Sequence, residues 1–188
     1  MNKKIIVKPG LGYTDTIFTS FCLKTLNFWK CLNVTPNQLT CFGFYASIIS
    51  LYNLYYKNIK IAILFLVIRA YFDFIDGLYA RKYDQVTVFG DYFDHISDII
   101  YCIGVFVILF LKMKDKRYIY ILLIFAGLFL AQFGCSEKKY RELIKDKSET
   151  SISLSRYLCF DSKYLDLFDN CMLYLAMIYV MIEFGNEK

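Results

Sequence analysis

The chain has 188 residues, 57% of them hydrophobic, and a formal net charge of +5. Its mean hydropathy is +0.41, and its apolar residues form blocks of about twenty, the length that spans a bilayer as a helix. This pattern argues against a soluble domain and predicts an all-α membrane protein. The basic residues lie largely between the apolar blocks, which is typical of membrane topology rather than of nucleic-acid binding.

The N-terminal segment combines basic and amphipathic features. Met1 to Lys8 is basic, with no apolar stretch of the kind found in a cleaved signal peptide. Residues 13–32 place Ile17, Phe21 and Phe28 among polar positions at helical spacing, with Lys24 between them and Trp29 and Lys30 near the end, which predicts an interfacial helix. We therefore expect residues 1–34 to form a cytoplasmic N-terminal region and residues 35–188 to form the transmembrane domain.

Five apolar segments follow. The first span begins after "TPNQLT", where Pro36 suits the first turn of a helix, and it continues through residues 42–56. Further spans are expected near residues 61–80, 91–111, 118–135 and 164–184. Residues 148–162 are ambiguous, so the prediction is a polytopic helical bundle of five spans, or of six if residues 152–160 enter the membrane.

Lysine and arginine counts give the expected orientation. With the N-terminus inside, the inner segments hold 14 of these residues and the outer segments hold 7. Because cytoplasmic segments carry the excess of basic residues, we expect a cytoplasmic N-terminus. An acidic region in the second and third spans then lies at the cytoplasmic face.

This acidic region consists of two helical faces. Positions i, i+3, i+4 and i+7 of a helix share one face. The first face combines Asp73 and Asp76 with Gly77 and Ala80, and the second combines Gly90 with Asp94 and Asp98. If the faces pack together, the small residues allow the backbones to approach closely, and the four carboxylates meet in a pocket near the membrane surface.

Four carboxylates in such a pocket need positive charge. Each costs roughly 2.5–3.5 kcal/mol on insertion scales at bilayer depth. Arg81 and Lys82 could neutralise part of this charge, but hard oxygen ligands suit two Mg²⁺ or Mn²⁺ ions, and a two-metal site suggests phosphoryl chemistry. Either acidic pair alone could instead be a solvated helix face.

The same stretch, "DFIDGLYARKYDQVTVFGDYFDHISD", resembles a family signature. The CDP-alcohol phosphotransferases (CDP-alcohol phosphatidyltransferases) of membrane phospholipid synthesis carry D-x2-D-G-x2-A-R-x8-G-x3-D-x3-D. All eight fixed positions match, at Asp73, Asp76, Gly77, Ala80, Arg81, Gly90, Asp94 and Asp98. The resemblance implies transfer of a phosphatidyl or phospho-alcohol group from a CDP-linked donor to an alcohol hydroxyl, with release of CMP.

The resemblance also implies the roles of the four aspartates. Asp73, Asp76 and Asp94 would hold two divalent ions, Mg²⁺ or Mn²⁺, at the pyrophosphate of the donor. Asp98 would contribute to this metal site or take the proton from the acceptor hydroxyl, and it is the expected general base.

The other motif positions are expected around the nucleotide. Gly77, Ala80 and Gly90 would make room for it, and Arg81 would donate hydrogen bonds to phosphate. Upstream, "TPNQLT" resembles the P-N-x-x-T element that precedes these domains. Its Asn37 and Thr40 could reach the cytidine pocket or could cap the first span.

Three other residue types give simpler expectations. The single histidine, His95, is expected to be a neighbour of the metal site rather than a ligand. Arg69, within the second span, is expected to pair with a carboxylate rather than to line the cavity. The seven cysteines are scattered and form no C-x-x-C pair, so neither a disulfide framework nor a zinc site is predicted.

The identity of the substrates stays open at this point. "ARKYDQVTVFG" resembles phosphatidylinositol synthases, which use CDP-diacylglycerol, whereas "TPNQLT" and "YFDHISD" resemble choline and ethanolamine phosphotransferases, which use a CDP-linked head group with diacylglycerol. Two other classes remain, an Asp-rich membrane prenyltransferase and a non-catalytic membrane protein. The expected partners are the CDP-linked donor, an alcohol acceptor, membrane lipids and a second copy of the chain in a homodimer.

Overall fold

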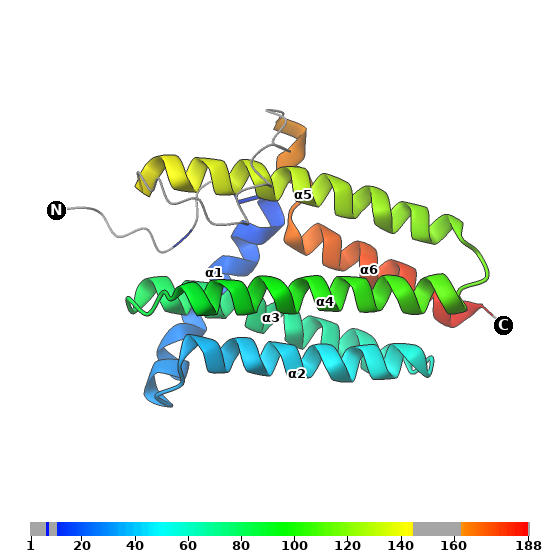
Figure 1. The fold of residues 1–188 in the computed structure, drawn as a ribbon, viewed down its shortest axis with the longest axis horizontal. Coiled ribbons are helices and arrows are strands. Elements are labelled where there is room, and N and C mark those ends of the chain that lie inside the picture. Colours follow the sequence, from blue (N-terminus) through cyan, green and yellow to red (C-terminus); the bar gives the residue numbers. More distant parts are fainter. Residues whose placement is uncertain (1–6, 8–10, 145–162, 188) are drawn as a thin grey trace.

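The computed structural model describes residue 7, residues 11–144 and residues 163–187. Every regular element in this part of the chain is helical, as expected. The helices are α1 (Tyr13–Cys31), α2 (Pro36–Tyr55), α3 (Ile59–Lys82), α4 (Val88–Lys112), α5 (Arg117–Ile144), the short 3₁₀ helix η2 (Lys163–Leu167) and α6 (Asn170–Asn186). Figure 1 shows that α2 to α6 alternate in direction, whereas α1 crosses them at a steep angle near one end.

Local sequence signals explain where the helices begin. Thr35 and Gln38 form a capping box before α2, in which the Gln38 side chain accepts a hydrogen bond from the Thr35 N–H at 2.8 Å. Pro36 occupies the first turn of α2, as predicted. Thr87 caps α4 by accepting a hydrogen bond from the Gly90 N–H at 3.0 Å.

Three helices end in the same way. Asn33, Lys57 and Asp84 follow α1, α2 and α3 with φ angles of 52°, 59° and 56°. A residue in this left-handed region allows the chain to turn back and satisfy the last carbonyls of a helix. These ends permit the short connections that place α2, α3 and α4 beside one another.

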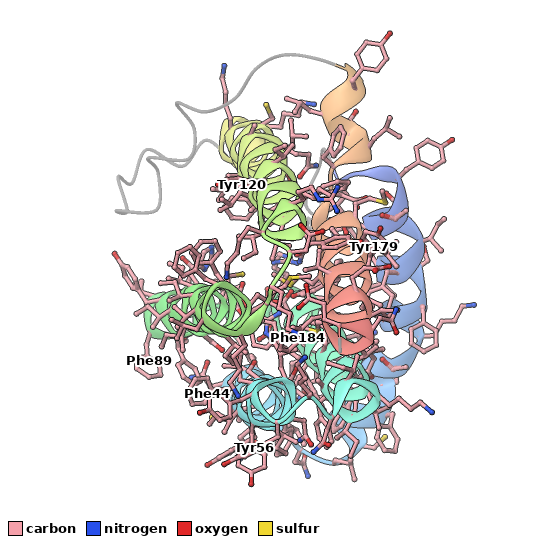
Figure 2. All side chains as sticks on the ribbon, turned by 90° about the vertical axis from the view of Figure 1, so that its right-hand side faces the viewer. Phe44, Tyr56, Phe89, Tyr120, Tyr179 and Phe184 are labelled. Atoms are coloured by element: carbon pink, nitrogen blue, oxygen red, sulfur yellow. The ribbon has the colours of Figure 1, made fainter. Side chains whose placement is uncertain are left out.

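Within the described residues, two helices are long and apolar enough to cross a membrane by length and composition. They are α4 and residues 117–136 of α5, and their most apolar windows are 22% and 39% buried. Large apolar side chains project outward from this part of the bundle, including Phe89 and Tyr120, whereas Phe184 of α6 is fully buried (Figure 2). Helix α6 has 17 residues, close to the lower limit of about 17 for a spanning helix.

Helix α1 is amphipathic in its packing. Cys22 and Leu26 are buried against α3, whereas Ile17, Phe21 and Phe28 are exposed on the other side. Trp29, expected beside the exposed side chains, is half-buried. Its indole N–H donates to the Tyr71 hydroxyl of α3 at 2.8 Å. This hydrogen bond satisfies the polar end of the ring inside the protein.

The C-terminal helix departs from the expected continuous span over residues 164–184. Helix η2 ends at Leu167, and α6 starts separately at Asn170. Asp169 causes this start, since its carboxylate accepts a hydrogen bond from the Met172 N–H at 3.1 Å. The ambiguous segment, residues 148–162, lies outside the described residues.

The N-termini of α1 and α6 cap each other. The buried Asp169 carboxylate accepts hydrogen bonds from the Asp15 N–H at 2.9 Å and the Thr14 hydroxyl at 2.5 Å. In return, Asp15 accepts from the Asn170 and Cys171 N–H groups at 3.2 and 2.9 Å. Burial, opposed by the Cys171 hydrogen bond and reinforced by Asp169, raises the pKa of Asp15 to about 6. We name this contact the α1–α6 junction.

One cysteine corrects the sequence prediction. Cys22, Cys31, Cys41, Cys102 and Cys171 are free thiols. Cys135 on α5 is disulfide-bonded, so the prediction of no disulfide is wrong at this residue. Spacing along the chain does not report pairs of cysteines that tertiary structure brings together.

Gly12 is required by the α1–α6 junction. A Cβ added at Gly12 would lie 2.3 Å from the Asp169 Cβ and 2.6 Å from the Asp166 carbonyl oxygen. Gly12→Ala should therefore destabilise the protein by about 1–3 kcal/mol, the usual cost of overpacking, measured as a lower melting temperature in detergent. Gly127→Ala is the matched control, because a Cβ at Gly127 meets nothing within 4 Å; equal melting temperatures for both variants would contradict the expectation.

Candidate metal centre

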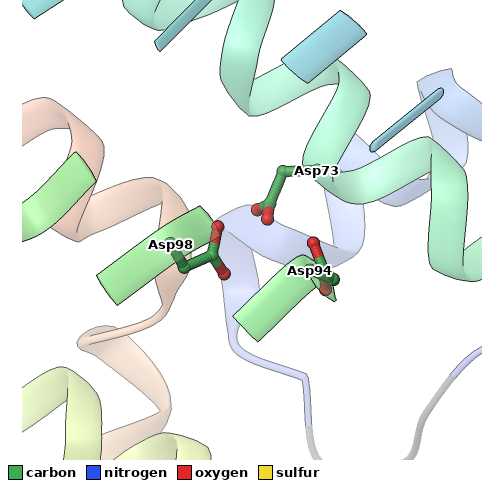
Figure 3. A group of neighbouring side chains, drawn as sticks. All are labelled: Asp73, Asp94 and Asp98. Carbon is green, nitrogen blue, oxygen red and sulfur yellow. The ribbon is translucent and has the colours of Figure 1, made fainter. Parts of the chain in front are cut away.

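Three of the four motif carboxylates converge. Asp73 projects from α3, and Asp94 and Asp98 project from α4, so that one oxygen of each lies within 4.8 Å of the others. Figure 3 shows the three side chains pointing toward one another. All three are half-buried, as expected of a pocket rather than of a solvated helix face.

The fourth carboxylate, Asp76, does not belong to this group of three. It is 4% exposed, and it accepts a hydrogen bond from the Thr40 hydroxyl of α2 at 2.6 Å. The expectation that all four carboxylates meet is therefore correct for three of them. Asp76 differs because a polar group on α2 satisfies its carboxylate.

A small cavity connects these groups. Its walls come from α2, α3 and α4, with Asp76 beside the three converging carboxylates. The lining residues are Thr40, Gly43, Arg69, Asp73, Asp76, Asp94, Ser97 and Asp98. Helix α2 thus forms a wall of the cavity that the acidic pattern alone did not indicate.

The small residues of the motif make room for side chains of the protein itself. A Cβ at Gly90 would lie 2.7 Å from the Asn37 Oδ1 of α2, and a Cβ at Gly77 would lie 3.1 Å from the Arg81 Nη1. Helix α2 packs on both α3 and α4. These glycines were expected to let α3 and α4 approach each other closely. Instead, the two helices are connected by α2, which packs on both. Ala80 lies half-buried near the end of α3.

The residues of "TPNQLT" have different roles. Thr35 and Gln38 cap α2, so capping by Asn37 or Thr40 is wrong. The Thr40 hydroxyl donates to Asp76, and its oxygen lies 3.2 Å from the Pro36 carbonyl oxygen. Asn37 lies against Gly90, so both residues face the motif helices.

Arg69 is the cationic side chain inside the cavity. It is 3% exposed, it forms an ion pair with Asp98 and it donates a hydrogen bond to the Tyr174 hydroxyl. Its guanidinium lies 4.5 Å from the centre of the Tyr101 ring and 5.5 Å from that of Tyr174. The expected pairing with a carboxylate is confirmed, and Arg69 lines the cavity as well.

Two residues of α6 reach the site, although no sequence motif predicts this. The Asn170 side-chain amide and the Tyr174 hydroxyl donate to the same Asp73 oxygen, Oδ2, at 3.0 and 3.1 Å. His95, in contrast, bonds to the Asp91 carbonyl oxygen at 2.7 Å, and its ring faces Phe133 of α5. It is not part of the converging group, which agrees with its expected role as a neighbour.

The donor set fits a hard divalent cation. Three carboxylates this close repel one another in a poorly solvated cavity. Arg69 pairs with Asp98, whereas Asp73 accepts hydrogen bonds from a neutral amide and a neutral hydroxyl. Oxygen ligands of this kind suit Mg²⁺ or Mn²⁺.

Comparison with known proteins agrees with this chemistry. The model of one family, described as CDP-alcohol phosphatidyltransferase, matches residues 33–182. An archaetidylinositol phosphate synthase of Pyrococcus horikoshii is 37% identical over 67 residues, 36% of either chain. A CDP-diacylglycerol–serine O-phosphatidyltransferase of Bacillus subtilis is 32% identical over 69 residues, which make up 37% of this chain and 39% of the relative.

A third relative is a CDP-diacylglycerol–glycerol-3-phosphate 3-phosphatidyltransferase of Rickettsia felis. It is 44% identical over 71 residues, which make up 38% of this chain and 39% of the relative. The matches thus span between 36% and 39% of the length of these three curated relatives. No solved structure matches the chain.

The Thr40–Asp76 hydrogen bond yields a stability prediction. Thr40→Val keeps the side-chain shape but leaves the buried Asp76 carboxylate without this donor. Leaving a buried polar group without its partner costs about 1–3 kcal/mol, so the melting temperature should fall by several degrees. Thr16→Val is the control, because the Thr16 hydroxyl bonds to the Gly12 carbonyl oxygen at the start of its own helix, at 2.8 Å; a fall no larger than that of the control would argue against the contact.

Proposed function

The chain belongs to the CDP-alcohol phosphatidyltransferase family, and we propose that it transfers a phosphatidyl-type group from a CDP-linked lipid to the hydroxyl of a small polar alcohol, releasing CMP. The observation that carries this proposal is the convergence of Asp73, Asp94 and Asp98 beside a cavity. Their oxygens are the ligands that a phosphate-binding divalent ion requires. A non-catalytic role does not explain this costly acidic cavity.

The proposed metal ligands are Asp73, Asp76, Asp94 and Asp98. Bound Mg²⁺ or Mn²⁺ ions supply charge neutralisation for the phosphate oxygens of the donor. Asp76, held by Thr40 at the edge of the cavity, would complete a two-ion site. The Arg69 ion pair orients Asp98, which in the proposal also accepts the proton of the attacking hydroxyl.

The nucleotide is proposed to bind where α2 meets the motif helices. Asn37 and Thr40 face this region from α2, and Arg81 lies over Gly77 at the end of α3. Arginine offers planar donors that match phosphate oxygens. Ala80 and Gly90 flank the same end of the bundle, consistent with a pocket for a bulky CDP group.

The membrane arrangement is also part of the proposal. Helices α2 to α6 would give five spans, with α1 on the membrane surface and its exposed Ile17, Phe21 and Phe28 in the lipid. Lys82 ends α3 at the end of the bundle that holds the acidic cavity, and α1 crosses the bundle near the same end. This end would face the cytoplasm. The transmembrane domain, residues 35–188, contains nearly all of the family match.

A direct assay of CMP release tests the proposal. Purified protein with Mn²⁺, CDP-diacylglycerol and an alcohol should release CMP, and Asp94→Asn should slow release at least about 100-fold, because it removes a ligand of ions that contribute several kcal/mol to phosphoryl chemistry. Asp91→Asn is the matched control, since Asp91 is exposed one turn earlier on α4. No CMP with any donor, or full activity of Asp94→Asn, would refute the proposal.

The choice of donor can be tested separately. The names of two relatives contain CDP-diacylglycerol, which favours a CDP-linked lipid over a CDP-linked head group. We expect CMP release from CDP-diacylglycerol with serine, glycerol 3-phosphate or inositol phosphate as acceptor. Release from CDP-choline with diacylglycerol, but not from CDP-diacylglycerol, would instead support the choline and ethanolamine alternative.

A further inference from the structure

We propose that Asn170 and Tyr174 of α6 are positioning residues that hold Asp73 in the orientation needed to bind a metal ion. This inference rests on the metal site of the proposed function. Both side chains donate to Asp73 Oδ2, at 3.0 and 3.1 Å. Two donors on one oxygen fix the rotation of the carboxylate, as groups behind a metal ligand commonly do.

The two donors are electrically neutral, which distinguishes them from Arg69. An amide and a hydroxyl orient Asp73 without cancelling its negative charge. Asp98, by comparison, is paired with the guanidinium of Arg69. Asp73 is therefore oriented by two groups that carry no charge of their own.

The direction of the Tyr174 hydrogen bond follows from its other partner. Arg69 donates to the Tyr174 hydroxyl, and a guanidinium has no acceptor. The hydroxyl oxygen must accept from Arg69, so its own proton points to Asp73. Arg69 thus orients Asp98 directly and Asp73 through Tyr174, which links the ligands of the two motif helices.

Asn170 is itself fixed by the α1–α6 junction. Its backbone N–H donates to Asp15 of α1 at 3.2 Å, while Asp169, the preceding residue, caps α6. The first turn of α6 is therefore held between α1 and the Asp73 carboxylate. The position of α1 therefore influences the geometry of the metal site through the first turn of α6.

Direct measurement of Mn²⁺ binding tests the inference without any CDP-linked donor. Titration of the full chain in detergent, monitored by the spin-resonance signal of free Mn²⁺, gives the dissociation constant. Asn170→Ala and Tyr174→Phe should each raise it about 10-fold, in line with the roughly 10–100-fold effects of groups behind metal ligands. Tyr118→Phe is the matched control, because the Tyr118 hydroxyl bonds to Glu183 at 3.2 Å, away from the motif.

A second measurement separates positioning from general stabilisation. The melting temperature of the metal-free variants should stay within a few degrees of the parent, while the rise in melting temperature on adding Mn²⁺ should shrink, because ligand stabilisation follows affinity. Unchanged Mn²⁺ affinity in both variants would overturn the inference and leave the proposed transfer reaction standing. Unfolding of both metal-free variants would also overturn it, in favour of a structural role. Absence of Mn²⁺ binding by the parent would overturn both the inference and the metal site.

Discussion

The mutual approach of acidic side chains inside an apolar bundle is the constraint on which the rest of the structure depends. Carboxylates from α3 and α4 come within 4.8 Å of one another in surroundings where like charges repel strongly. Two of them are met by groups from other elements, Asp98 by Arg69 and Asp73 by α6, and Thr40 of α2 meets the neighbouring Asp76. The packing of α2 and α6 on the motif helices is therefore tied to the same chemistry as the motif itself.

The α1–α6 junction extends this organisation to the surface of the bundle. The N-terminus of a helix carries partial positive charge and unpaired N–H groups, which a carboxylate can satisfy. Here two such N-termini meet, and Asp15 and Asp169 each serve the opposite helix. Because α1 carries an exposed apolar side and α6 carries a partner of Asp73, the junction joins the proposed membrane surface to the proposed metal site.

Features that depend on residues close together in the sequence could be predicted from the sequence. Apolar blocks predicted the helices, Pro36 marked the start of α2, and the spacing of the aspartates predicted the convergence of Asp73, Asp94 and Asp98. The start of α6 at Asp169 could also have been read from the sequence, because an aspartate before an apolar run is a helix-start signal.

Long-range contacts carry no such pattern. Asn170 and Tyr174 stand 97 and 101 residues after Asp73, and nothing in their spacing connects them to it. The same holds for Thr40, which lies 36 residues before Asp76 and separates this carboxylate from the other three. These contacts depend on how α2 and α6 pack on α3, which is decided by side-chain shape over the whole bundle.

An experimental structure with Mn²⁺, using its anomalous scattering to locate the ions, tests the central claim most directly. The account predicts Mn²⁺ density in the cavity between α3 and α4, at coordination distance from carboxylate oxygens of Asp73, Asp94 and Asp98, about 2.0–2.3 Å for a small hard cation. Ions elsewhere in the chain, or an empty cavity with the three carboxylates turned apart, would contradict it.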